Sequence, residues 1–449
     1  MPTRVLPTPR FTAATAPGAL PLLGHAPALL RRPHAFVAGL PAHGDLVRLR
    51  LGPLDAYVAC HPELVRRLLT QDRTYDKGGL VLDKAREVFG EGLATCPAAA
   101  HRRQRRLLQP AFHRDRLPGY AALMAEEIAA TTAPWRDGDT VDLPAAMYRL
   151  ATAVTARCLF AAHDRAGSLP LHESADVITR GVGRRVMLPL PGLDRLPTPG
   201  NRRFRRARQT LRETTEQLIA DYRATGTDHG DLLSVLLGAQ DEDGQGLSDA
   251  EIHDQVVTFL LAGTETTAAT LSWAWTLLAA NPAVRRRLHA ELDTVLDGRP
   301  ARHEDLPALP LTARIVSETL RLHPPAWLLS RTVTTATELG GHRVPAGATI
   351  LFSPYLLHRR ADLFPCPDRF DPDRWLTTAH PAPGTYTPFG LGARRCIGDT
   401  FGTTEAVLAI ATIAARWTVT PTPGRPVRPT RSASLIPRPF AATLTRRPR

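Results

Sequence analysis

The segment from Phe389 to Gly398, FGLGARRCIG, constrains the fold more than any other part of the chain. It places Cys396 close to Gly390, Gly392 and Gly398, and glycine allows a sharp turn and a close approach between backbone and ligand. A helical pattern follows directly, so Cys396 is expected beside unpaired backbone N–H groups and the positive end of a helix dipole. Because such donors favour the thiolate, Cys396 is suited to be the axial ligand of a flat metal macrocycle.

This segment resembles the haem-ligand loop of the cytochrome P-450 family, whose pattern is Phe-Gly-x-Gly-x-Arg-x-Cys-x-Gly. Every fixed position of that pattern is matched, by Phe389, Gly390, Gly392, Arg394, Cys396 and Gly398. The alternative, an inert cysteine in a glycine-rich turn, does not account for so complete a match. The resemblance implies a mainly α-helical fold with small β-sheets. This is the family's triangular prism, with haem b (iron protoporphyrin IX) between a long central helix and the Cys396 loop.

The composition is that of a globular protein in a reducing compartment. Of the 449 residues 43% are hydrophobic, and the five cysteines form no CxxC pair, which argues against a disulfide framework and a structural zinc site. No signal peptide is evident, and no apolar run reaches the roughly 20 residues that span a bilayer. We therefore expect a cytoplasmic protein without a membrane anchor.

The formal net charge is +13, and nearly all of the positive charge is arginine. Nucleic-acid binding is disfavoured because no basic block alternates with aromatic residues and no zinc-finger or helix-turn-helix spacing is present. A basic face that docks an acidic protein and an arginine-rich solvated surface remain equally open.

We expect one domain. Residues 1–33 are interrupted by seven prolines and are interpreted as an extended N-terminal segment. Residues 34–449 contain no internal repeat and no linker, so they are interpreted as a single cytochrome P-450 domain.

The local patterns predict mostly helices. A β-hairpin is expected at 44–59 with its turn at Gly52-Pro53, and a second one within 339–350 around Val344-Pro345-Ala346-Gly347. Helices are expected at about 61–70, 101–109, 117–132, 147–161, 174–186, 202–222, 249–280, 311–322 and 400–417. The Pro/Gly-rich break at 188–200 resembles the lid over the family's substrate pocket.

The longest predicted helix opens with a capping box, Ser248 with Glu251, and is apolar nearly all round, which predicts burial. It contains a glycine, an acid and hydroxyl groups at Gly263, Glu265 and Thr266, which are costly in a buried helix. A threonine hydroxyl can bond a carbonyl one turn back and open the helix. The alternative is a threonine-rich packing helix with a surface glutamate.

By resemblance this stretch is the family's oxygen-activation motif. Gly263 then lets a ligand approach the backbone, Thr266 supplies the hydroxyl that assists oxygen activation, and Glu265 relays protons from solvent. Glu318 and Arg321, three apart on one helical face, resemble the family's Glu-x-x-Arg pair. Arg374 is the expected third member, and we assign this set to folding and haem retention rather than to chemistry.

The resemblance also implies cationic partners for the two haem propionates. His101 and Arg105 match a Trp-x-x-x-Arg motif, with histidine replacing the tryptophan, and Arg331 and Arg394 match two further positions. The alternative for the first pair is a solvated basic helix face.

The function implied is a haem-thiolate monooxygenase that inserts one oxygen atom from O2 into a C–H bond. No flavin or iron–sulfur segment is present, so electrons from NAD(P)H would come through an external ferredoxin and ferredoxin reductase. Arg102, Arg103 and Arg395 are candidates for the ferredoxin dock.

The substrate is expected to be small and apolar. The segments that match the family's pocket are mostly apolar: 80–93, 182–190, 259–262, 325–329 and 435–436. The chain resembles family members that oxidise cyclised terpenes in secondary metabolism. The implied substrate is a cyclic terpene such as a pentalenene-like sesquiterpene, and one of its methyl groups would be oxidised successively to alcohol and aldehyde. Two alternatives are a peroxide-driven fatty-acid hydroxylase, which would not need Glu265 and Thr266, and a non-catalytic haem-based sensor.

Overall fold

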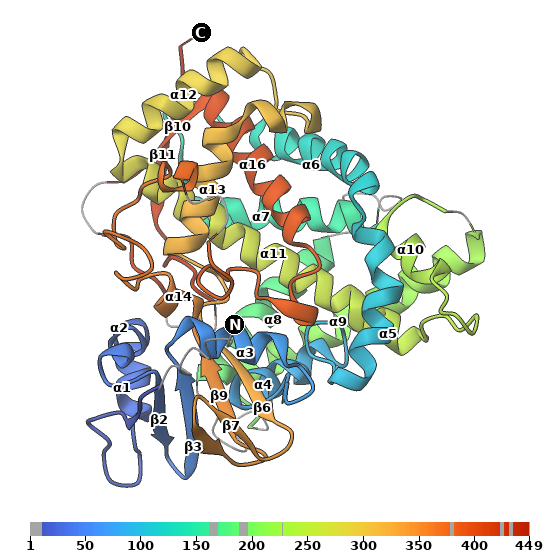
Figure 1. Cartoon of the computed structure of the whole chain (residues 1–449). Coiled ribbons are helices and arrows are strands. Elements are labelled where there is room, and N and C mark those ends of the chain that lie inside the picture. Colours follow the sequence, from blue (N-terminus) through green and yellow to red (C-terminus); the bar gives the residue numbers. More distant parts are fainter. Residues whose placement is uncertain are drawn as a thin grey trace, which may run out of the picture. The chain divides into compact units, whose positions relative to one another are not determined.

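The computed structural model describes residues 11–160, 169–187, 196–226, 228–377, 381–422, 426–430 and 434–448 (Figure 1). The chain divides into two compact units. The first comprises Met1–Leu82, Leu328–Pro367 and Pro381–Arg395, and the second comprises Asp83–Trp327, Asp368–His380 and Cys396–Arg449. Helices predominate and the sheets are small, so the predicted fold class is confirmed. The interpretation of 34–449 as one domain stays a prediction.

The first unit is built on a six-stranded sheet in the order β1-β2-β3-β9-β6-β4. Its strands are β1 (Ala13–Thr15), β2 (Leu46–Leu51), β3 (Leu54–Ala59), β4 (Tyr75–Asp76), β6 (Leu329–Val333) and β9 (Thr349–Phe352). The unit also contains α1 (Ala26–Arg31), α2 (Pro33–Gly39), α3 (Pro62–Thr70) and α14 (Pro354–Leu357), and the short η1 (Leu40–Ala42) and η6 (Gly392–Arg394). Because β1 and α1 lie within residues 1–33, that segment is not simply extended.

The first predicted hairpin is confirmed, with Leu51 paired to Leu54 across the Gly52-Pro53 turn. The second was misplaced. The hairpin in that region joins β7 (Thr337–Leu339) to β8 (His342–Val344), and its two-residue turn is Gly340-Gly341. The turn at 345–347 instead leads into β9, which pairs with β6 and β3 rather than with β8.

The second unit is a helical bundle around α11 (Asp249–Ala280). The helices that pack against it are α7 (Leu143–Leu159), α8 (Leu169–Met187), α9 (Pro199–Thr225), α13 (Pro310–Leu322) and α16 (Asp399–Arg416). Its other elements are α5 (Ala98–Leu108), η2 (Gln109–Phe112), η3 (Arg114–Arg116), α6 (Leu117–Thr132), β5 (Thr140–Asp142), α10 (Leu232–Gly238), α12 (Pro282–Leu296), η5 (His303–Ala308), α15 (Arg374–Thr377), β10 (Trp417–Pro421) and β11 (Ala441–Arg446). The helix α4 (Leu80–Phe89) begins in the first unit and ends in the second.

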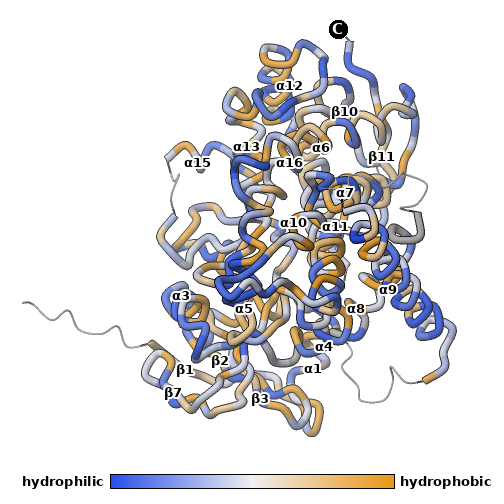
Figure 2. The backbone as a smooth tube through the Cα atoms, turned by 90° about the vertical axis from the view of Figure 1, so that its right-hand side faces the viewer, coloured by the Kyte–Doolittle hydropathy of each residue, from blue (hydrophilic) through white to orange (hydrophobic). Residues whose placement is uncertain are grey.

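The predicted capping box at the start of α11 is present. The Glu251 amide N–H donates to the Ser248 hydroxyl at 3.3 Å, and the Ser248 amide N–H donates to the Glu251 carboxylate at 2.9 Å. Most residues of α11 are buried, as its apolar composition predicted. By contrast α9 is amphipathic: Phe204, Ala207, Leu211 and Leu218 are buried, and much of the helix has the hydrophilic colour in Figure 2.

In the part of the chain that the structure describes, no helix is both long enough and apolar enough to cross a membrane.

Candidate active site

The cysteine loop folds as its glycines require. Gly390 and Gly392 have φ of +72° and +71°, a region that favours glycine. A Cβ on Gly392 would lie 2.4 Å from the Leu69 carbonyl oxygen, so no other residue fits without a shift of the backbone. The Arg395 amide N–H then closes a turn onto the Gly392 carbonyl at 3.1 Å. The turn ends just before Cys396, and α16 begins three residues later, as the sequence predicted.

Solvent exposure separates Cys396 from most of the other cysteines. Cys60, Cys96 and Cys158 are buried, and burial raises the pKa of Cys60 to about 12 and that of Cys158 well above the usual range. Cys396, by contrast, is exposed in the glycine loop. Among the described residues no three His, Cys, Asp or Glu side chains cluster to hold a metal ion.

One face of the buried helix α11 is open. Ala262 is exposed, and Phe259, Glu265 and Thr266 are half-buried, whereas their neighbours Leu260, Leu261, Thr264 and Thr267 are buried. The Thr266 hydroxyl donates to the Ala262 carbonyl one turn back at 2.6 Å, which is the bond expected from the sequence. The Thr270 hydroxyl repeats the pattern on the Thr266 carbonyl at 2.8 Å.

The acid on this face has a pKa displaced towards neutrality. Burial raises the pKa of Glu265 to about 7, and a hydrogen bond with the Ser434 side chain acts in the opposite direction. Glu265 can therefore be either protonated or ionised near neutral pH, as a proton relay requires. Ser434 was not identified from the sequence, because nothing in its local pattern distinguishes it.

The segments predicted to line a pocket meet partly around α11. The Leu435 amide N–H donates to the Pro325 carbonyl at 2.9 Å, and the Trp273 indole donates to the Leu435 carbonyl at 2.8 Å. The Leu93 amide N–H donates to the Gln255 side chain of α11 at 3.0 Å. Residues 188–190 of the predicted pocket, and most of the predicted lid at 188–200, lie outside the described residues.

Gly263 has a different surrounding from the one expected. A Cβ at this position would lie 3.1 Å from the hydroxyl oxygen of Thr155 on α7. The missing side chain therefore allows α7 to pack closely against α11. Packing against α7 accounts for this glycine, and close approach of a ligand to its backbone stays a prediction.

A second buried acid, Glu405 of α16, was missed by the sequence analysis. It accepts a hydrogen bond of 3.4 Å from the Thr267 hydroxyl of α11, and burial raises its pKa well above the usual range. Glu405 thus connects α11 to the helix that follows Cys396. The sequence predicted only a helix at 400–417, and a single glutamate within it gave no signal.

Two of the predicted propionate partners lie in the first unit. Arg331 is 5% exposed and Arg394 is 7% exposed. Arg394 donates to the Asp76 carboxylate at 2.7 Å, but Arg331 has no ion pair among the described residues and bonds only the Ser330 carbonyl, at 2.9 Å. Burial and the nearby Arg394 charge lower the pKa of Arg331 to about 10. A buried guanidinium without a carboxylate partner calls for an anion.

The other two predicted partners, His101 and Arg105, share one face of α5 in the second unit. His101 is buried and Arg105 is half-buried, so the interpretation of this face as a freely solvated one is wrong. Phe389 and Gly398, which flank the cysteine loop, are both half-buried.

The predicted structural set is assembled. Arg321 donates to both oxygens of Glu318 at 2.8 Å, and Arg374 donates to Glu318 at 3.1 Å. Glu318 also accepts from the Trp375 indole at 3.1 Å and from the Asp371 amide at 3.0 Å. These last two donors, an indole and a backbone amide, were not predicted, because the motif names only charged partners.

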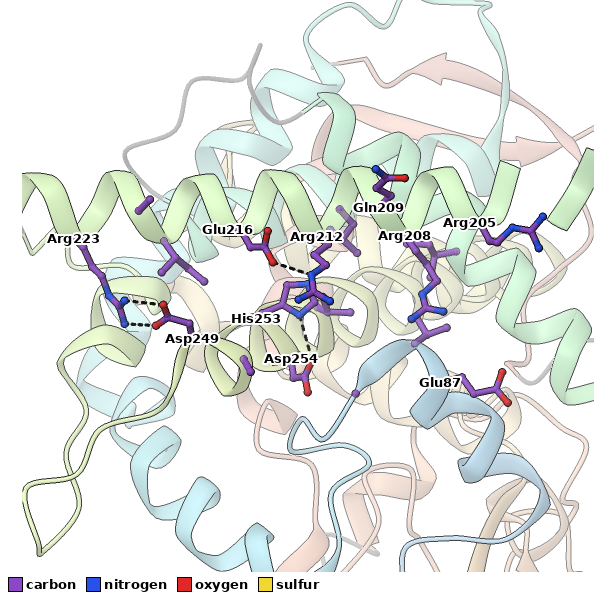
Figure 3. A pocket seen from close by; sticks show the side chains of 18 residues that line it. Glu87, Arg205, Arg208, Gln209, Arg212, Glu216, Arg223, Asp249, His253 and Asp254 are labelled. Atoms are coloured by element: carbon purple, nitrogen blue, oxygen red, sulfur yellow. Dashed lines mark hydrogen bonds and ion pairs between the residues drawn. The ribbon is translucent and has the colours of Figure 1, made fainter. Parts of the chain in front are cut away.

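A pocket of 720 Å³ lies elsewhere in the second unit, between α9, the first half of α11 and the end of α4 (Figure 3). Most of its charges are paired with one another: Arg212 with Glu216, Arg223 with Asp249, and His253 with Asp254. No predicted site residue lines it, and only the segment 80–93 reaches it. This pocket is therefore not the candidate active site.

The comparison with protein families decides the identity. The model of the family described as cytochrome P450 matches residues 15–443. The chain belongs to the cytochrome P450 family. Like its relatives it is a monooxygenase, and haem iron is the family's cofactor.

Three relatives align with this P450 over nearly its whole length. Pentalenene oxygenase of Streptomyces avermitilis is 48% identical over 441 residues, covering 97% of this chain and 98% of its own. Cyclooctat-9-en-7-ol 5-monooxygenase of Streptomyces melanosporofaciens is 49% identical over 418 residues, covering 92% and 91%. Cyclooctatin synthase of the same organism is 48% identical over 438 residues, covering 96% and 95%.

The residues present fit the haem of a P450. Cys396 is exposed in its glycine loop, and Ala262 is exposed within an otherwise buried helix of the same unit. In the first unit Arg331 is a buried cation with no carboxylate partner among the described residues, which suits an acidic group such as a propionate.

Proposed function

We propose that this P450 oxidises a C–H bond of a cyclic terpene, such as a pentalenene-like sesquiterpene, in secondary metabolism. The observation that carries the proposal is the near full-length similarity to three relatives, two of which are named as oxygenases, of pentalenene and of cyclooctat-9-en-7-ol. The predicted pocket segments are mostly apolar and 325–329 contains no charge, which suits a hydrocarbon rather than an acid. Successive oxidation of one methyl group to alcohol and then aldehyde is included in the proposal.

We assign the roles of the site residues as follows. Cys396 binds the haem iron as thiolate, and the bound haem supplies the activation of O2. Thr266 holds a proton at its hydroxyl, on the open face of α11, and Glu265 replenishes it. A pKa of about 7 supports the role of Glu265, because the group can then give up and regain a proton at neutral pH.

The remaining predicted residues hold the cofactor. Arg331, Arg394, His101 and Arg105 are proposed as partners of the haem propionates, and Phe389, Gly398 and Gly263 as residues that contact the haem. The buried set of Glu318, Arg321 and Arg374 is proposed to keep the fold rigid enough to retain haem.

The electron donors are proposed to be a ferredoxin and a ferredoxin reductase that uses NAD(P)H. Of the residues first considered for the dock, Arg103 is a weak candidate. Its guanidinium donates to Asp241 at 2.8 Å and to Glu251 at 3.2 Å, so its charge is already compensated. Arg102 and Arg395 are exposed and remain the proposed dock residues.

A single preparation tests the reaction class and the substrate. We expect the reduced, carbon-monoxide-bound enzyme to show the absorption band of a thiolate-ligated haem, and Cys396→Ala to lose that band. Cyclic terpenes should shift the ferric spin state on binding, whereas fatty acids should not. Turnover should require ferredoxin, reductase and NADPH.

The alternatives give different outcomes in the same preparation. Product formed with peroxide and fatty acid, but not with ferredoxin, would identify a peroxide-driven hydroxylase. A thiolate-type band without product under either condition would identify a sensor. Oxidation that survives in Cys396→Ala would refute the assignment of the iron ligand.

A further inference from the structure

Four leucines of the first unit are exposed close to one another. Leu20, Leu22, Leu23 and Leu54, here called the leucine tip, have exposed fractions of 49%, 88%, 55% and 49%. Among the described residues only two other large hydrophobic side chains are exposed, and both are far away in the sequence. Single exposed leucines are ordinary on a protein surface, but four gathered together indicate an interaction site.

Backbone hydrogen bonds bring the four residues together. Leu20 and Gly24 bond each other in both directions at 2.9 Å, which closes a tight turn around Leu22 and Leu23. The Gly52 amide then donates to the Leu23 carbonyl at 3.2 Å. The turn therefore lies against the end of the β2–β3 hairpin, the end that carries Leu54.

The apolar surface continues into α1, which begins two residues after Gly24. Five of its six residues, in the sequence APALLR, are apolar, yet none of the six is buried. A helix normally buries its apolar residues against the rest of the protein. Here residues 26–30 are only half-buried, so part of their apolar surface lies open beside the leucine tip.

The conformation of Leu22 supports a role outside folding. Its φ is +59°, in the left-handed region that a branched, bulky side chain rarely adopts. Its side chain is also 88% exposed, so it contributes nothing to the core. A residue that is both strained and exposed has no folding benefit to offset its cost, and such positions cluster at functional sites.

The charges close to the tip are positive. Arg31 and Arg32 at the end of α1 and Arg50 on β2 are exposed and form no ion pair within the described parts of the chain. The acid on the neighbouring strand, Asp55, is paired with Arg48 at 2.6 Å. Among the residues that the structure describes, the cations near the leucine tip are thus unpaired, whereas the carboxylate of Asp55 on the β2–β3 hairpin is already neutralised by an arginine.

We propose that the leucine tip inserts into the surface of an anionic lipid bilayer, with Arg31, Arg32 and Arg50 against the lipid phosphates. A protruding turn of this kind needs no matching cavity in a lipid surface, and the arginines complement anionic head groups. The contact is peripheral. If the proposed function holds, it brings the enzyme to the phase in which an apolar substrate dissolves, but the lipid contact itself does not depend on that function.

The test is sedimentation of the holoenzyme with lipid vesicles. We expect it to pellet with phosphatidylcholine vesicles that contain phosphatidylglycerol, and to pellet less with phosphatidylcholine alone or at high salt. The double variant Leu22→Asp, Leu23→Asp should bind at least about tenfold more weakly. Replacing Arg31 and Arg32 by Gln should weaken binding by about fivefold per arginine. Leu376→Asp, at another exposed leucine, is the matched control and should bind like the parent.

Asp is well tolerated at a left-handed position, so the double variant should keep its melting temperature and its haem spectrum. Failure of the parent to pellet with either vesicle would overturn the proposal, as would unchanged binding of the double variant. Self-association that the double variant abolishes, without lipid binding, would identify a second copy of the chain as the occupant and would also overturn it.

Discussion

Glu318 and Arg321 form a two-pronged ion pair in which both side chains are completely buried, with both N–O distances 2.8 Å. Arg374, the Trp375 indole and the Asp371 amide supply the remaining donors to the same carboxylate. The Glu318 carboxylate thus joins two chain segments, the helix α13 and residues 371–375.

Replacing Glu318 by Ala should therefore be severe. Two guanidinium groups would remain buried without their anion, and we expect a loss of about 3–5 kcal/mol in the free energy of unfolding. Denaturant unfolding, followed by the haem absorption, measures both stability and haem retention. The matched control is Asp373→Ala, which breaks the half-exposed pair with Arg287 at 2.7 Å and should cost less than about 1 kcal/mol. Similar costs for the two variants would contradict a structural role for the buried set.

Thr266→Ala tests the proposed proton path. Removal of the hydroxyl should lower the product formed per O2 consumed by at least about tenfold, because a positioned proton donor is lost. Thr266→Ser should restore most of the coupling. Thr270→Ala is the control, since Thr270 makes the same kind of bond one turn further along α11. Full coupling in Thr266→Ala would remove that residue from the mechanism.

The raised pKa of Glu265 predicts a pH dependence with a definite sign. As a proton donor Glu265 must be protonated, so coupling should be high below about pH 7 and should decline as the pH rises through that value. In Glu265→Gln the decline should disappear, with coupling low throughout. A profile of the same shape in both enzymes would assign the titration to another group.

The same shift affects stability. In the native state Glu265 keeps its proton up to about pH 7. In the unfolded state a glutamate loses its proton at about pH 4.3. Between these two pH values the native state therefore binds more protons than the unfolded state. The free energy of unfolding should therefore fall as pH rises through this window and level off above it. Glu265→Gln should remove that slope, as unfolding titrations at several pH values would show.

The sequence predicted those features that depend on local chemistry. The capping box at Ser248, the glycine turn before Cys396 and the pair of Glu318 with Arg321 each follow from residues a few positions apart. The sequence could not predict contacts between residues that are far apart along the chain. The turn at 345–347 correctly predicted a reversal, but only tertiary pairing places β9 beside β3 and β6.

The sequence also could not predict which residues of a buried helix face which neighbouring element. Periodicity could not show that Ala262 lies on the open face of α11 while Gly263 meets Thr155 of α7. An excess of arginine likewise could not show that Arg103 is engaged by Asp241 and Glu251. In a helix that is apolar all round, the faces are distinguished only by what packs against them.

The contact between Gly263 and Thr155 gives a prediction that sequence alone would reverse. Alanine is favoured over glycine in a helix by about 1 kcal/mol, so Gly263→Ala should stabilise an isolated α11. In the protein the new Cβ would lie 3.1 Å from the Thr155 hydroxyl oxygen, and this crowding should cancel or exceed the gain. In a Thr155→Ala background the same change should fill the space left behind and stabilise by about 1 kcal/mol. A double-mutant cycle of unfolding free energies measures the coupling, and additive effects would show that α7 does not restrict this position.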